Sequence, residues 1–110
     1  MTLSQLKTAL EGVGSDSFKD KVAYRSFPVG GAPMLPFICI METETDNFTA
    51  DSKVYKKRQY VDIELYTRYK DPSTESAIEA MFENNNLIWD KDEEYIESEE
   101  TLMITYEVVI

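Results

Sequence analysis

The chain has 110 residues with a formal net charge of -10, and it contains no histidine and one cysteine. This length predicts one domain over residues 1–110, with a core that needs no disulfide or metal to form. The carboxylate excess disfavours a nucleic-acid reader and adsorption to anionic membrane, because both need clustered Lys and Arg. The lack of histidine removes the commonest general base and transition-metal ligand, so we expect neither an enzyme nor a cofactor.

The single cysteine, Cys39, lies in the apolar run PFICIM, which is typical of a small buried side chain. A lone cysteine cannot form an internal disulfide, so an oxidising compartment is not implied. No stretch reaches the ~18 apolar residues of a membrane span. The N-terminal segment lacks the pattern of a signal peptide, and we expect the protein to be made in a cytoplasm and to have no membrane partner.

Residues 2–14 carry the pattern of an amphipathic helix. Apolar side chains recur at spacings of three and four, at Leu3, Leu6, Leu10 and Val13. Thr2 or Ser4 can cap the start of this helix, and Gly12 and Gly14 signal its end. Strands are expected at 21–27 and 37–43, separated by a loop that contains Pro28, Gly30, Gly31 and Pro33.

The rest of the chain is arranged around the run from Lys53 to Lys70. Val61, Ile63 and Leu65 alternate with polar neighbours, which predicts a strand with one buried face. One straight strand over 53–69 would span about 50 Å at ~3.3 Å per residue, against the usual ~17–20 Å. We therefore expect its first part to leave the sheet and to form a projecting arm at about 43–58.

A second helix is expected from residue 72. Asp71 is a good N-cap, Pro72 fits the first helical position, and Glu75 favours the positive end of the helix dipole. Strands then follow at Trp89 and at 101–110. The expected order is α-β-β-β-α-β-β, an α+β fold in which two helices pack on one face of a mostly antiparallel or mixed sheet.

The acidic tract from Asp90 to Glu100 partly matches the spacing of a calcium loop. Asp90, Asp92 and Glu94 have that spacing, but Tyr95 replaces the required glycine and Thr101 the final carboxylate. We therefore expect no metal there. The tract can instead pair with the basic segment before the central strand, and across a subunit interface such pairs fix orientation. The interface candidates are Lys53, Tyr55, Lys56, Lys57, Arg58, Asp92, Glu93, Glu94 and Glu97.

Several segments together resemble a known group of proteins. They are the Y-x-S-F-P motif at Tyr24 to Pro28, the D-x-x-V-Y motif at Asp51 to Tyr55, the strand YVDIELYT at Tyr60 to Thr67, and the I-E-S-E turn at Ile96 to Glu99. In this order they resemble small tail-terminator and head–tail joining proteins of long-tailed phages and prophages of Gram-positive bacteria.

The resemblance implies a structural protein rather than a catalyst. Its subunits would close into a hexameric ring at the head-proximal end of the tail tube, bound to the major tail protein and to the head connector or stopper. DNA would pass through the lumen without specific binding, and the protein would reside in the tail or neck of the virion after assembly in the host cytoplasm. A head-side adaptor or stopper remains open beside a tail terminator.

A different class of function stays open beside this one. A compact acidic domain can mimic DNA by its charge, so the chain could be a binding module that inhibits a host nucleic-acid-handling protein. That alternative predicts tight binding to a basic host protein and no self-assembly.

Overall fold

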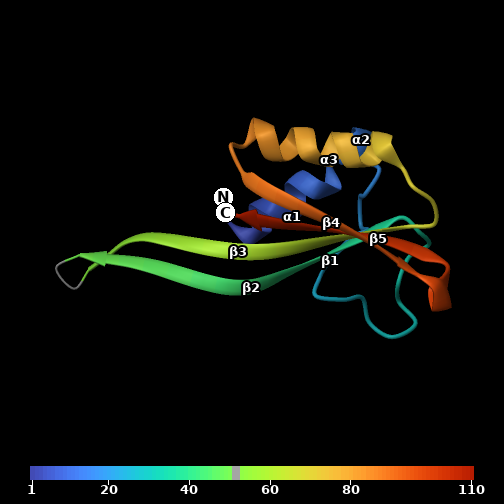
Figure 1. Cartoon of the computed structure of the whole chain (residues 1–110), viewed down its shortest axis with the longest axis horizontal. Helices are drawn as coiled ribbons and strands as arrows, with labels where there is room; N and C mark the ends of the chain where they lie inside the picture. The colour runs from blue at the N-terminus through green and yellow to red at the C-terminus, as the bar shows by residue number, and fades with distance from the viewer. Residues whose placement is uncertain (51–52) are drawn as a thin grey trace.

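The computed structural model describes the backbone of residues 1–50 and 53–110 and the side chains of residues 1–45 and 58–110. It confirms an α+β fold with a mixed sheet (Figure 1). The elements are α1 (Leu3–Glu11), α2 (Val13–Asp16), β1 (Val22–Tyr24), β2 (Phe37–Ala50), β3 (Lys53–Thr67), α3 (Pro72–Asn84), β4 (Ile88–Ile96), the 3-10 turn η1 (Glu97–Glu99) and β5 (Thr101–Val109).

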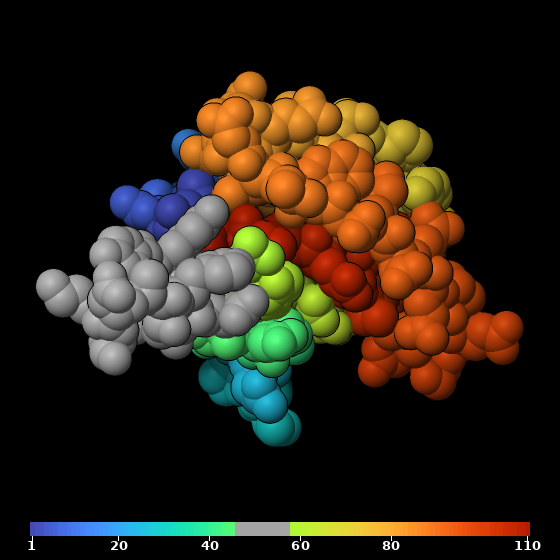
Figure 2. Space-filling model, turned by 60° about the vertical axis from the view of Figure 1, so that its left-hand side comes forward, coloured from blue at the N-terminus to red at the C-terminus, as the bar shows by residue number. Residues whose placement is uncertain are grey.

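The described strands form one five-stranded sheet in the order β1-β2-β3-β5-β4. β1 pairs with β2 in parallel, and every other neighbouring pair is antiparallel. Helices α1 and α3 lie on one side of this sheet, and its other side carries no helix in the described part of the chain (Figure 1). We call this second side the open face. In Figure 2, atoms of β5 (red) are visible between those of β3 (yellow-green) and β4 (orange).

The first helix begins at the predicted cap but is shorter than expected. The Thr2 side chain accepts a hydrogen bond from the Gln5 backbone N–H, and the Gln5 side chain accepts one from Thr2 N–H, which is a capping box. The prediction of one helix over 2–14 was wrong, because α1 ends at Glu11 and Gly14 takes a left-handed φ of 64°. This kink lies inside the short α2, which was not expected.

The helix α3 starts as the sequence predicted. Asp71 accepts a hydrogen bond from the Thr74 backbone N–H at 3.2 Å, and Pro72 occupies the first helical position. Its residues Ile78 and Phe82 point into the core and are completely buried. The expected strand at 21–27 is limited to Val22–Tyr24, because Arg25 turns the chain with a φ of 67°.

The core lies between the helices and the sheet. Val61, Ile63 and Leu65 of β3 face α1 and α3 and are at most 1% exposed. Ile104 and Tyr106 of β5 lie opposite Leu65 and Ile63 in the register and join the same core. Because strand side chains alternate, this register fixes which residues must occupy the open face.

Candidate functional site

The two long strands run past the rest of the sheet. β5 pairs with β3 only from Tyr60 to Thr67, and β1 pairs with β2 only from Ile38 to Ile40. On the N-terminal side of Tyr60, β3 pairs only with β2 among the described strands, and this pairing continues to Ala50 and Lys53. The resulting two-stranded ribbon extends away from the helices (Figure 1). At ~3.3 Å per residue the six residues before Gln59 cover roughly 20 Å. The molecule is 51 Å along its longest axis.

This ribbon overlaps the predicted arm at 43–58, whose basic residues were the first interface candidates. The expectation that the first part of the run leaves the sheet was wrong, because β3 is one strand from Lys53 and stays paired with β2. The side chains of Lys53, Tyr55, Lys56 and Lys57 lie outside the described residues. Arg58 is partly buried, and its Nη1 lies 3.3 Å from the Tyr60 hydroxyl oxygen. The sequence nevertheless fixes the charge of the segment, since four of its six residues from Lys53 to Arg58 are Lys or Arg.

The open face carries a concentration of carboxylates. Asp62 of β3, Glu107 of β5 and Asp90 of β4 lie side by side across three strands. The alternate positions of β3, β4 and β5 on this face hold Asp62, Glu64, Asp90, Asp92, Glu94 and Glu107. From Tyr60 to Tyr66 of β3, and along β4 and β5, no Lys or Arg occupies this side of the described sheet.

Local electrostatics on the open face disfavour further ionisation. Burial raises the pKa of the Asp62 carboxyl. Burial, a hydrogen bond to Glu64 and the negative charge of Glu64 raise the pKa of the Tyr66 hydroxyl, which donates to Glu64 at 2.8 Å. Burial first and Glu64 second raise the pKa of the Cys39 thiol. The surface therefore suits a cationic partner better than an anionic one.

The acidic interface candidates do not share one surface. β4 continues through the acidic tract to Ile96 because it pairs residue by residue with β5. Asp92 and Glu94 consequently lie on the open face, whereas Glu93 lies on the helix side and pairs with Lys70 at 2.5 Å. Glu97 lies in η1, at the end of the molecule opposite to the arm (Figure 1).

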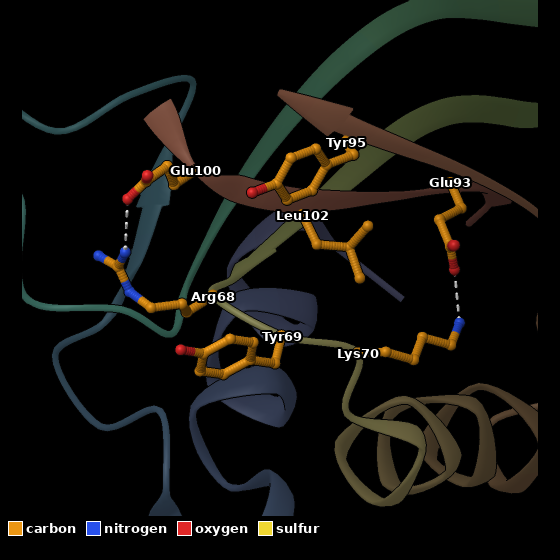
Figure 3. A pocket seen from close by; sticks show the side chains of 7 residues that line it. All are labelled: Arg68, Tyr69, Lys70, Glu93, Tyr95, Glu100 and Leu102. Carbon is orange, nitrogen blue, oxygen red and sulfur yellow. Dashed lines mark hydrogen bonds and ion pairs between the residues drawn. The ribbon is translucent and has the colours of Figure 1, made fainter. Parts of the chain in front are cut away.

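A slot lies between β5, the end of β4 and the segment that joins β3 to α3 (Figure 3). Its lining residues are Arg68, Tyr69, Lys70, Glu93, Tyr95, Glu100 and Leu102, and its volume is about 640 Å³. We call this the tyrosine slot. The rings of Tyr69 and Tyr95 lie on either side of Leu102, and the ion pairs Arg68–Glu100 and Lys70–Glu93 lie at its two ends.

An ion network missed from the sequence ties α3 to the sheet. Glu75 is 3% exposed, and its carboxylate contacts Lys70 at 3.0 Å and Lys91 at 3.2 Å. Lys91 also contacts Glu79 at 2.8 Å, and the hydroxyl of the buried Tyr106 donates to Glu79. The signal was present: Glu75 and Glu79 share a helix stripe with Ile78 and Phe82, at spacings of three and four.

The network has consistent pKa shifts. Burial alone would raise the pKa of Glu79, but hydrogen bonds from Lys91 and Tyr106 outweigh it and hold that pKa below its ordinary value. Hydrogen bonds from Lys91 to Glu79 and Glu75 raise the pKa of Lys91 against the effect of burial. Lys70 and Lys91 thus balance the charges of Glu75 and Glu79, and these ion pairs hold α3 against β4 and β5.

The described residues contain no group of three or more His, Cys, Asp or Glu placed to hold a metal ion. Within the same part of the chain, no helix is long and apolar enough to cross a membrane. The arrangement can act by binding: a basic segment lies at one end, and carboxylates lie on the open face and at the opposite end. No protein-family model matches the chain, and a search of curated proteins finds no match.

Proposed function

We propose that this protein is a self-associating structural subunit, a tail terminator or tail-completion protein of a long-tailed phage. Its subunits form a ring, six in the family it resembles, at the head-proximal end of the tail tube. The ring joins the tube to the head connector or stopper. The phage assignment rests on the motif resemblance, and self-association rests on the shape and charge of the chain.

One observation supports the proposal of self-association. The basic segment from Lys53 to Arg58 and the acidic turn η1 lie at opposite ends of a molecule that is 51 Å long. Within one subunit the two cannot meet, because β4 reaches Glu97 by running away from the base of the arm. A surface that meets a different surface on the next copy makes a head-to-tail contact, which closes into a ring when the rotation is suitable.

The open face supports the second part of the proposal, a passage for DNA. Its carboxylates repel phosphate, so a lumen lined by this face conducts DNA without holding it. Phe37 and Met103 lie among them on the same side and are partly buried, which leaves apolar area for contacts to the tube or connector.

The test is charge reversal of the arm. The triple variant Lys56→Glu, Lys57→Glu, Arg58→Glu should fold normally, lose ring formation and leave tails unjoined to heads in electron micrographs. The matched control, Lys19→Glu, Lys21→Glu, Arg25→Glu, has the same net charge change at sites far from the arm and should assemble. Normal infectious particles from the arm variant would overturn the proposal.

The carboxylate row on the open face favours one other candidate, an acidic inhibitor of a host nucleic-acid-handling protein. Negative charges on a rigid sheet can occupy a basic DNA-binding surface. Pull-down of a basic nucleic-acid-binding protein from host lysate, lost on Asp62→Asn with Glu107→Gln, would favour this candidate if the chain also fails to self-associate.

A further inference from the structure

The tyrosine slot exposes aromatic surface that the fold does not use. Tyr69 is 78% exposed and Tyr95 is 52% exposed, and neither belongs to the core. Leu102, which is 7% exposed, forms the apolar floor between them (Figure 3). Exposed tyrosines around an apolar floor, rimmed by charged groups, are typical of the energetic centre of a protein interface.

The charges around the slot define its occupant. Glu93 and Glu100 line it, and Glu97 and Glu99 lie in the adjoining turn η1. In the lining, Arg68 and Lys70 pair with Glu100 and Glu93, so the excess negative charge beside the slot comes from η1. A segment that combines lysines with an aromatic ring matches this surface, because ammonium groups bind carboxylates and the faces of tyrosine rings.

We infer that the tyrosine slot receives the arm of a second copy of this chain. The sequence of the arm has the required chemistry, with Tyr55 between basic residues in KVYKKR. The slot and the arm lie at opposite ends of the subunit, so an arm bound in a neighbour's slot leaves one free slot and one free arm for the next copies. This is the condition for a closed head-to-tail ring.

The slot can open for its occupant at little cost. The Arg68–Glu100 pair spans 3.6 Å, and its side chains are 52% and 77% exposed. Exposed pairs of this kind contribute at most ~1 kcal/mol. An incoming lysine can therefore replace Arg68 as the partner of Glu100. Lys70 remains fixed at the other end, since it also contacts the buried Glu75.

This inference rests on the proposed self-association, and cysteine cross-linking separates the two. Two proteins are mixed, one with Lys56→Cys and one with Arg68→Cys, and both also carry Cys39→Ala. Position 68 lines the slot, and its substitution leaves both tyrosines of the slot in place. The matched control acceptor is Glu107→Cys, an exposed site on the open face. Mild oxidation and mass spectrometry then identify which mixed disulfide forms.

A disulfide of position 56 with position 68, but not with position 107, is the expected result. A disulfide with position 107 instead would overturn the slot as receptor while leaving self-association standing. Disulfides only between two copies of position 56 would show a symmetric arm-to-arm contact and also overturn the inference. No mixed disulfide at any concentration, with a monomeric parent protein, would overturn self-association itself.

A tyrosine substitution gives an independent measurement. Tyr95→Ser should weaken self-association about tenfold or more, which is typical for the loss of an aromatic group at an interface centre. Tyr24→Ser is the matched control, because Tyr24 is 50% exposed and lies outside the slot. Equal association constants for the two variants would contradict the inference, provided that both unfold at the same temperature as the parent.

Discussion

The two faces of β3 differ in what they contribute, although their residues alternate along one segment of chain. Val61, Ile63 and Leu65 face the helices and are at most 1% exposed. Asp62 and Glu64, between them, face away from the helices, and Asp62 lies beside Glu107 of β5, which in turn lies beside Asp90 of β4. One face is therefore occupied by the fold, and the other remains available to a partner.

The difference teaches where changes should affect stability and where they should affect binding. Apolar burial on the helix side is the main source of folding free energy. On the open face, neighbouring carboxylates repel each other across the strands, so this face lowers stability slightly. A surface whose charges lower the stability of the fold is a candidate for a functional contact.

The largest expected effect is a test of the helix side. Ile63→Ala should lower the free energy of unfolding by about 3 kcal/mol, because it removes a completely buried side chain and leaves a cavity. Asp62→Ala, one residue earlier, should change it by less than about 0.5 kcal/mol. Urea denaturation of both variants measures the contrast, and equal losses would contradict the assignment of faces.

The ion network under α3 should give the next largest effect. Lys91→Met removes one partner of the buried Glu75 and of Glu79, and should cost about 2 kcal/mol. The cost is below that of a fully broken buried pair because Lys70 still holds Glu75. Thermal unfolding of Lys91→Met measures this cost, and Lys19→Met, at an exposed lysine outside the network, is the control. Similar melting temperatures for the two variants would count against the network.

The pH dependence of this cost has a defined sign. The lowered pKa of Glu79 gives stability that is fully present above the ordinary value of 4.5 and lost as the pH falls through the folded pKa. The raised pKa of Lys91 gives stability that is present below 10.5 and lost as the pH rises through the folded pKa. The difference between parent and Lys91→Met should therefore be greatest between these two values and shrink on both sides.

A smaller effect is expected at Thr67, at the edge of the buried face. Its hydroxyl oxygen is buried and has no hydrogen-bond partner among the described residues. Thr67→Val has nearly the same shape and removes that oxygen, so it should raise the free energy of unfolding by about 1 kcal/mol. Thr105→Val on the open face is the control, and a loss of stability at Thr67→Val would show that its hydroxyl is satisfied in solution.

The smallest effect is expected on the open face itself. Glu107 lies between Asp62 and Asp90 in the register, so Glu107→Gln should raise stability by about 0.5 kcal/mol or less. The gain should disappear in high salt, which screens repulsion between exposed charges. A loss of stability in low salt would show that these carboxylates attract a neighbour rather than repel each other.

Part of this arrangement could be predicted from local sequence. Alternation over Val61 to Leu65 identified the buried face of β3, and Asp71 with Pro72 identified the start of α3. These signals involve neighbouring residues whose geometry is fixed by the strand or helix period. The α+β class with a mixed sheet followed from them and is confirmed.

The rest depends on contacts between distant segments. The tyrosine slot joins residues 68–70 to Tyr95 and Leu102, and only the pairing of β5 between β3 and β4 brings them together. The same pairing separates Glu93 from Asp92 and Glu94, which the sequence grouped as one acidic tract. Glu75 was assigned to the helix dipole, and only the packing of α3 over Lys91 showed that it is buried.

Sedimentation of two complementary charge-reversed proteins tests the central claim, head-to-tail association through opposite ends. One carries the arm reversal at Lys56, Lys57 and Arg58, and the other carries Glu97→Lys with Glu99→Lys beside the slot. Each protein alone should remain monomeric at concentrations where the parent associates. Their mixture should associate again, with the two proteins alternating, because the reversed arm meets the reversed slot and the parent arm meets the parent slot. Parent-like association of either protein alone, or no association in the mixture, would contradict the account.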